Sequence, residues 1–508
     1  MPELIDFIRS GQRLDDHHPW PRALVPEEIW RLVIEQLVAG RLSLLDLWGE
    51  RDPAHGMVHM AVLDGHGFEA AIFSLECPDG AFPSVGQAHA PALRLERTLA
   101  DLYGLVAQGL PDQRPWLDHD QWGMRHPLGD TAASALPSPL YEFLAAEGES
   151  LHQVFVGPVH AGIIEPGHFR ITASGETIVR LEQRLGYTHK GIEGLMLGAP
   201  LERAAKLAAR TSGDSTVAYS LAFAHAVEAA TCTSVPDRAN WLRALMAELE
   251  RLANHLGDIG AICNDAAFAL MHAHFGVLRE RVLRFCDGAF GHRMMRDVVV
   301  PGGISLDLEA QGVLALRALI AEIRLRFPRL VELYDNTASL QDRTVGTGRL
   351  REDLARQYGA GGYVGRGSGR NFDARRNLPY GPYRELRFDV PVLHEGDVNA
   401  RVWIRIHEIE QSLLLMEQIL ARLPMGAIRA ELATLGRAQE GMALVEGFRG
   451  DIFVWLRLST SRTVERCRLR DPSWFQWPLF EAAIEGNIVA DLPLCNKSFN
   501  CSYSGHDL

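Results

Sequence analysis

No stretch of this 508-residue sequence offers the run of about 18 apolar residues that a membrane-spanning helix needs. The first residues carry acidic side chains and no long apolar core, which is unlike a secretory signal. Basic residues are outnumbered, because 51 Lys and Arg stand against 64 Asp and Glu and give a net charge of −13. A general nucleic-acid surface needs concentrated positive charge, so we expect no nucleic-acid partner.

Cysteine is sparse and irregularly spaced. The sequence has seven cysteines, an odd number, and no two of them have the spacing of a Cys-x-x-Cys pair. We therefore expect no disulfide scaffold in so long a chain, and a reducing cytoplasm suits the composition. Only Cys495 and Cys501 are close in sequence, and the five residues between them do not predict a metal site.

Composition and patterning predict an α+β protein in two parts, residues 1–145 and 146–508. The first part is expected to be a small α+β domain. Its end, residues 130–145, is rich in Ala, Ser and Pro and is interpreted as a linker. The second part is expected to combine a β-hairpin region, a core of long bundled helices and a small C-terminal β element.

Local patterns support the first domain. Two short strand-like runs at 57–63 and 68–75 flank the glycines of a turn and predict a β-hairpin. Apolar residues at helical spacing over 24–48 and 93–105 predict helices. A hairpin accompanied by two helices is typical of a small α+β domain.

A polar, turn-rich stretch from Gly157 to Gly198 carries the main candidate site. Two β-rich runs around Ser174 and Gly175 predict a hairpin. Titratable side chains gather in the turns on both sides of it: His160, Glu165, His168, His189 and Glu193. Turns and strands that hold such groups close together are typical of a site on a rigid frame. Spacing alone leaves a structural, hydrogen-bonded role open for each histidine.

Long amphipathic helices dominate the middle of the sequence. One helix is predicted to follow a Pro-containing cap at 234–237. Its apolar seam has residues spaced alternately three and four apart: Leu242, Leu245, Leu249, Leu252, Leu256 and Ile259. A second seam of this kind runs from Val402 to Leu423. Such helices bury their apolar faces against one another, which predicts a bundle. Runs at 452–456 and 463–469 predict the strands of the C-terminal element.

Residues 359–385 interrupt the helical pattern with seven glycines and five arginines. No Gly-Lys-Ser/Thr word and no strand–turn–helix pattern accompanies them, so the stretch does not predict a phosphate-binding loop. Arg366 and Asp373 instead indicate an ion-paired loop. That loop either walls a substrate pocket or is purely structural, and the sequence leaves both readings open.

Several words of the second part together resemble a known family: GPVHAGIIEPGHFR at 157–170, YTHKGIEGLM at 187–196, VPDRANWLRALMAELERLANHL at 235–256, RGSGRNFDAR at 366–375 and EGNIVADLPL at 485–494. They resemble the D-type subunit of NADH–quinone oxidoreductase (complex I) and, still more, the large subunit of membrane-bound, energy-converting nickel–iron hydrogenases of the formate hydrogenlyase type. The first part is similar to the C-type subunit of complex I through HPLG at 126–129. The chain thus resembles a C–D fusion.

The resemblance fails at the metal ligands. In these hydrogenases two pairs of cysteines hold a nickel–iron centre, because soft thiolates suit those metals. The four matching positions here are Ser212, Ser215, Ser502 and Gly505. A hydroxyl is much harder to deprotonate than a thiol and does not replace a thiolate. We therefore expect no metal and no nickel–iron centre on this chain.

The resemblance also implies which residues would meet a quinone headgroup. His168 takes the place of the family's hairpin-turn histidine and Asp265 that of the carboxylate behind it, a pair suited to donating protons. Glu193 matches a carboxylate that hydrogenases use for proton movement. The family's quinone-binding tyrosine corresponds to Gly213, and Tyr219 lies a little under two helical turns further on. The expected substrate-binding set is His160, Tyr219, Arg366 and Asp373.

The resemblance finally implies a peripheral subunit of a membrane-bound, complex-I-like, ion-translocating oxidoreductase on the cytoplasmic face of the inner membrane. It would be an enzyme only within its complex and bind no cofactor itself. The expected partners are an iron–sulfur small subunit like the B-type subunit of complex I, a ferredoxin-like subunit, and membrane-arm subunits of the H type and the antiporter type. A quinone or other acceptor would occupy a cavity beside the partner's iron–sulfur cluster. The alternatives are a structural coupling subunit with a vestigial site and, less favoured, a hydrogenase with unusual ligands.

Overall fold

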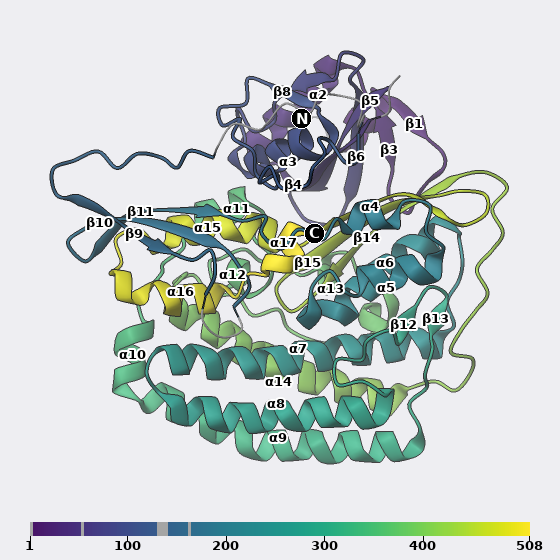
Figure 1. Ribbon diagram of the computed structural model, residues 1–508. Helices are drawn as coiled ribbons and strands as arrows, with labels where there is room; N and C mark the ends of the chain where they lie inside the picture. Colours follow the sequence, from purple (N-terminus) through teal and green to yellow (C-terminus); the bar gives the residue numbers. More distant parts are fainter. Residues whose placement is uncertain (1–3, 52–54, 130–140, 161–163) are drawn as a thin grey trace.

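The computed structural model describes residues 4–51, 55–129, 141–160 and 164–508. A small N-terminal sheet domain sits on a larger body of long helices and a second sheet (Figure 1). This arrangement confirms the predicted α+β fold class. Most of the expected linker lies outside the described residues.

The N-terminal domain is built on a sheet with strand order β1-β3-β6-β5-β4. Strands β4 (Leu42–Arg51), β5 (Gly56–Asp64) and β6 (Ala70–Glu76) pair antiparallel, and β3 (Arg22–Leu24) lies between β6, to which it is parallel, and β1 (Gln12–Leu14). Strands β5 and β6 are the predicted hairpin. Glycines between them permit the tight turn.

Two helices cover this sheet. Helices α2 (Glu27–Val38) and α3 (Leu93–Tyr103) bury apolar side chains against it, and α3 agrees with the helix predicted there. The helix predicted over 24–48 is correct only as far as Val38, because the residues that follow form β4. Strand β4 is buried on both faces, and an apolar run of that kind cannot be told from a helix by periodicity.

The predicted hairpin of the site region is present. Strands β10 (His168–Ser174) and β11 (Thr177–Arg184) pair antiparallel around the turn at Gly175, where a φ of +58° favours glycine. Strand β9 (Leu151–Val156) adds to the other edge of β10. The small sheet projects from the helical body (Figure 1).

The helical body confirms the predicted bundle. Helix α7 (Asp237–Asp265) is its centre and packs against α8 (Ala269–Phe290) and α14 (Val398–Arg422), while α9 (Ala310–Asn336) packs outside α8. The predicted seam of α7 is fully buried in the largest apolar core. Because this apolar seam is buried, the position of the helix is fixed, and so are the positions of its polar side chains and of its C-terminal end.

A second sheet with strand order β16-β15-β14-β2 covers the bundle. Its strands β14 (Gln439–Glu446), β15 (Asp451–Leu458) and β16 (Val464–Arg470) include the two predicted from sequence. Helix α6 (Thr216–Ala230), which is buried on nearly every side, packs on this sheet. The fourth strand, β2 (His17–His18), comes from the N-terminal part and pairs parallel with β14.

Aromatic and charged contacts join the N-terminal domain to this sheet. The ring of Trp48 lies 5.6 Å from that of Phe453 and 5.5 Å from that of Trp455. Asp46 of β4 accepts hydrogen bonds from Arg468 of β16 at 2.7 and 3.0 Å. In the described part of the chain, no helix combines the length and apolarity that a bilayer crossing needs.

Candidate functional site

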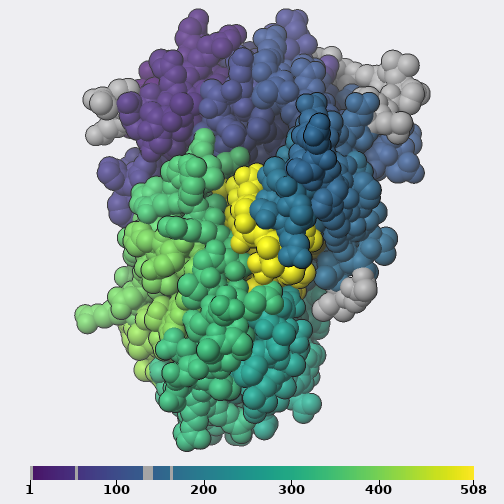
Figure 2. All heavy atoms as spheres, turned by 90° about the vertical axis from the view of Figure 1, so that its left-hand side faces the viewer, coloured from purple at the N-terminus to yellow at the C-terminus, as the bar shows by residue number. Residues whose placement is uncertain are grey.

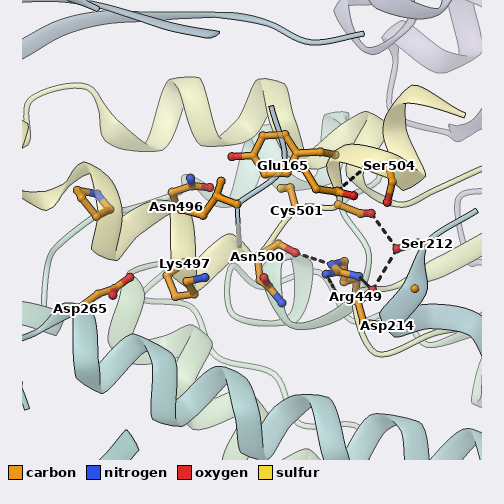
Figure 3. A pocket seen from close by; sticks show the side chains of 15 residues that line it. Glu165, Ser212, Asp214, Asp265, Arg449, Asn496, Lys497, Asn500, Cys501 and Ser504 are labelled. Atoms are coloured by element: carbon orange, nitrogen blue, oxygen red, sulfur yellow. Dashed lines mark hydrogen bonds and ion pairs between the residues drawn. The ribbon is translucent and has the colours of Figure 1, made fainter. Parts of the chain in front are cut away.

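A cavity of about 400 Å³ lies where the β9–β10 loop, the turn η2 (Gly213–Ser215), the end of α7 and helix α16 (Leu492–Phe499) meet. In Figure 2 the C-terminal segment, in yellow, reaches the surface between the blue β9–β11 region and the green helical body. Most labelled side chains of the lining are polar or charged (Figure 3). The residues that line the cavity include Glu165, Ser212, Asp214, Asp265, Arg449, Lys497, Cys501 and Ser502.

Two of the predicted ligand positions meet at this cavity as hydroxyl groups. The Oγ atoms of Ser212 and Ser502 share a hydrogen bond of 2.8 Å. Ser212 Oγ lies 3.0 Å from Asp214 Oδ1, and Ser502 Oγ accepts a 2.9 Å hydrogen bond from the backbone N–H of Gly505. Ser502 thereby caps helix α17 (Tyr503–Asp507). Both hydroxyls are therefore held by protein hydrogen bonds.

An ion pair lies beside the first pair of ligand positions. Arg449 Nη1 donates to Asp214 Oδ1 at 2.6 Å and to Ser215 Oγ at 3.2 Å, and Nη2 donates to Asp214 Oδ2. Burial favours the neutral form of Asp214, but Arg449 outweighs it and holds the pKa of this carboxyl below its usual value. The resulting guanidinium cation would repel a metal ion placed next to it.

The fourth ligand position has no room for a side chain. A Cβ added at Gly505 would lie 2.4 Å from Asp471 Oδ2, closer than real Cβ contacts come. Asp471 is fixed there because Tyr219 donates its phenolic O–H to Oδ2 at 2.8 Å and Ser473 donates its N–H to Oδ1 at 2.9 Å. Tyr219 is fully buried and is not part of the lining, so it supports the cavity wall and does not face a substrate.

The donor set does not fit a nickel–iron centre. Cys501 is the thiol of the lining, and burial raises its pKa, which disfavours the thiolate that such metals need. Across residues 4–51, 55–129, 141–160 and 164–508, no group of three or more His, Cys, Asp or Glu is arranged to hold a metal ion.

The structure separates the predicted His–Asp pair. Asp265, the last residue of α7, lines the cavity, and burial raises the pKa of its carboxyl. His168 is not part of the lining, and its ring packs 4.8 Å from that of Phe143. Burial, reinforced by Arg170, lowers the pKa of His168, so the neutral ring is favoured.

The β9–β10 loop contributes Glu165 instead. Glu165 lines the cavity and accepts a 3.0 Å hydrogen bond from the backbone N–H of Ser504. His160 lies outside the lining, and its Nε2 is 2.8 Å from the carbonyl oxygen of Gly167, which ties the two ends of the loop together. Of the two residues, only Glu165 is placed to touch an occupant.

Glu193 is also away from the cavity. It lies in the first turn of helix α4 (Ile192–Met196), and its Oε1 accepts hydrogen bonds from Arg468 at 3.3 Å and from the Leu469 N–H at 3.1 Å. Arg468 in turn is bound by Asp46 of the N-terminal domain. Burial raises the pKa of Glu193, and its Oε2 has no hydrogen-bond partner among the described residues.

The glycine- and arginine-rich loop is a buried ion-pair network. Arg366 contacts Glu408 at 2.6 Å, Glu446 at 2.8 Å and Asp373 at 3.4 Å, and its side chain is 1% exposed. Asp373 also pairs with Arg375 at 2.6 Å. The ion-paired loop is therefore present, but Arg366 and Asp373 are enclosed by their partners and do not line the cavity.

Sequence reasoning missed three charged residues of the lining. Asp214 lies between Ser212 and Ser215 in the sequence, so the motif that contains these two serines could also have predicted Asp214 as a residue of the cavity. Lys497 follows the EGNIVADLPL word and is one of three lysines in the sequence. Arg449 carries no local signal, because it reaches the cavity from the turn between β14 and β15.

Two family profiles match the chain, and both describe subunits of a respiratory NADH dehydrogenase. Residues 258–439 match the 49 Kd subunit of the respiratory-chain enzyme, and residues 25–134 match its 30 Kd subunit. The chain thus carries in one polypeptide two domains that these descriptions assign to two subunits.

Individual relatives lead to the same family. Formate hydrogenlyase subunit 5 of Escherichia coli (strain K12) is 31% identical over 436 residues, which cover 84% of this chain and 77% of that protein. The D-type subunit of NADH-quinone oxidoreductase from Desulfotalea psychrophila is 33% identical over 341 residues, covering 66% of this chain and 91% of that protein. The chain belongs to the family that unites these oxidoreductase subunits, with the 30 Kd and 49 Kd domains fused, and the predicted resemblance is confirmed.

A solved structure shares the fold. It is that of the membrane-bound sulfane sulfur reductase, described as an archaeal respiratory membrane complex. One of its chains superposes with a TM-score of 0.67 and 24% identity, covering 72% of this chain and 100% of that one. This similarity shows that the two chains share a fold, and the chemistry of the cavity follows from its own residues.

Proposed function

We propose that this chain is a peripheral subunit of a membrane-bound, complex-I-like, ion-translocating oxidoreductase, and that its cavity receives the electron acceptor, a quinone or another reducible molecule. The chain works without a nickel–iron centre. Electrons come from an iron–sulfur cluster on a small partner subunit that covers the open side of the cavity. The names of the relatives support this assembly, since they are a subunit of formate hydrogenlyase, a component of hydrogenase-4 and a subunit of NADH-quinone oxidoreductase.

One observation carries the proposal: the cavity is retained while its metal-binding chemistry is replaced. Ser212 and Ser502 bind each other, Arg449 pairs with Asp214, and Asp471 takes the space beside Gly505. The cavity therefore has hydroxyl groups and an ion pair where a metal site would have thiolates, and its fourth ligand position is blocked by Asp471. Such a cavity is better suited to hydrogen bonding with an organic acceptor than to coordination of soft metals.

Asp265 is the proton donor in this proposal. Its carboxyl lines the cavity, and its raised pKa keeps more of it protonated near neutral pH than an exposed aspartate would be. Glu193 is buried away from the cavity and pairs with Arg468, so we assign it no direct contact with the acceptor. The ferredoxin-like, H-type and antiporter-like partners and the cytoplasmic face of the membrane complete the proposed setting.

The test is electron transfer by the assembled complex carrying Asp265→Asn. We expect a loss of about 100-fold, the usual scale for a positioned acid, with assembly unchanged. A matched control is Asp335→Asn, an exposed acid of α9. Unchanged electron transfer in the assembled Asp265→Asn complex would support a structural coupling subunit with a vestigial site instead.

A further inference from the structure

Lysine is rare in this chain, and one lysine faces the cavity. The 51 basic residues include only three lysines, Lys190, Lys206 and Lys497. Lys190 donates to the Ser504 carbonyl oxygen at 2.9 Å, and Lys206 pairs with Glu202 at 2.7 Å on the surface. Lys497 lines the cavity, and the described residues give it neither an ion pair nor a hydrogen bond. Its ammonium group therefore keeps its donors free.

The surroundings of Lys497 place this free cation among polar groups. It extends from α16, which also contributes Asn496 to the lining, with Asn500 just after the helix, and it lies beside Asp265 (Figure 3). The other cation of the lining, Arg449, is already bound by Asp214. Lys497 is therefore the cavity's cation that remains available to an occupant.

We propose that Lys497 binds the reducible group of the occupant, and that this group is a carbonyl oxygen of a quinone-type acceptor. The inference rests on the proposed function and names the binding residue and the acceptor chemistry. An ammonium group offers three donors on a flexible stem and no acceptor, so it selects an electron-rich oxygen.

Lys497 takes the role of the residue that contacts the acceptor, which the family resemblance had assigned to His168. His168 packs on Phe143 outside the lining, whereas Lys497 and Asp265 line the same cavity. The cation that contacts the acceptor thus comes from the C-terminal segment instead of the hairpin. Asp265, beside it, keeps its role as the proton donor of the proposed function.

The first test uses the scarcity of lysine. The assembled complex is treated with acetic anhydride, with and without a saturating water-soluble short-chain quinone, and acetylation of each lysine is read by mass spectrometry. We expect the quinone to slow acetylation of Lys497 at least fivefold and to leave Lys206 unchanged. Equal protection, or none, at both lysines would overturn the proposal.

The second test separates binding from turnover. Lys497→Gln is expected to raise KM for the short-chain quinone about tenfold with a much smaller change in kcat, and Lys497→Arg to recover most of the loss. Lys206→Gln, the matched surface control, is expected to match the wild type. If Asp265→Asn abolishes quinone reduction while Lys497→Gln leaves KM unchanged, the Lys497 assignment is wrong and the proposed function stands. If the wild-type complex does not reduce the quinone, the assignment of a quinone to Lys497 is wrong, while the proposed function, which allows another acceptor, is still decided by electron transfer in Asp265→Asn.

Discussion

The contact between the two domains can be tested by removing one carboxylate. Asp46 and Arg468 are buried, with side chains 0% and 2% exposed, and they join strands from opposite ends of the chain. Asp46→Ala leaves the guanidinium in the interior with Glu193, at 3.3 Å, as its one remaining carboxylate partner among the described residues. Removing one partner of a buried pair costs about 3–5 kcal/mol, and because Glu193 remains we expect the lower end, about 3 kcal/mol.

The assay is urea denaturation of the full chain followed by circular dichroism. Glu27→Ala is the matched control, because it breaks the ion pair of Glu27 and Arg31, whose side chains are more than half exposed, and should cost at most about 1 kcal/mol. The triple variant Asp46→Leu with Arg468→Met and Glu193→Gln, which removes all three charges, is expected to recover most of the stability, since uncharged side chains can replace a buried charged group. If Asp46→Ala shifts the denaturation midpoint no more than Glu27→Ala does, this account of the interface is refuted.

Two further predictions concern the packing at Gly505 and the buried carboxyl of Glu250. Gly505→Cys should destabilise the chain by several kcal/mol, because its Cβ would overlap Asp471, whereas Gly213→Cys, which meets nothing within 4 Å, should be tolerated; equal thermal midpoints would contradict this. Glu250, whose pKa burial raises from 4.5 to about 8, binds its proton more tightly in the folded chain, so stability should fall as pH rises from 4.5 to about 8. Glu250→Gln should lose this dependence, and thermal midpoints that run parallel for both proteins from pH 5 to 9 would exclude the reasoning.

Local patterns predicted the helices and the hairpin well. The α7 seam, spaced by three and four, and the turn at Gly175 are set by neighbours in the sequence, and both are present. Strand β4 was missed because a strand buried on both faces loses its alternation. The family resemblance pointed to Ser212, Ser502 and Asp265, and the structure places all three in the lining of one cavity, while their roles stay predictions.

The charged partners could not be predicted, because they are joined only by the fold. Arg468 and Asp46 are 422 positions apart, and Arg449 and Asp214 are 235 apart. No periodicity links such residues, and their pairing depends on how the sheets and helices pack. His168 was expected beside Asp265 from its place in the family word, but its ring packs on an aromatic side chain outside the cavity.

The central claim is that this cavity serves electron transfer without a nickel–iron centre. The most direct measurement is the nickel content of the purified, assembled and active complex by inductively coupled plasma mass spectrometry. The account predicts nickel at background while electron transfer proceeds. One nickel per copy of this chain would contradict it, because hydroxyls and an ion pair would then be holding a metal that thiolates normally bind.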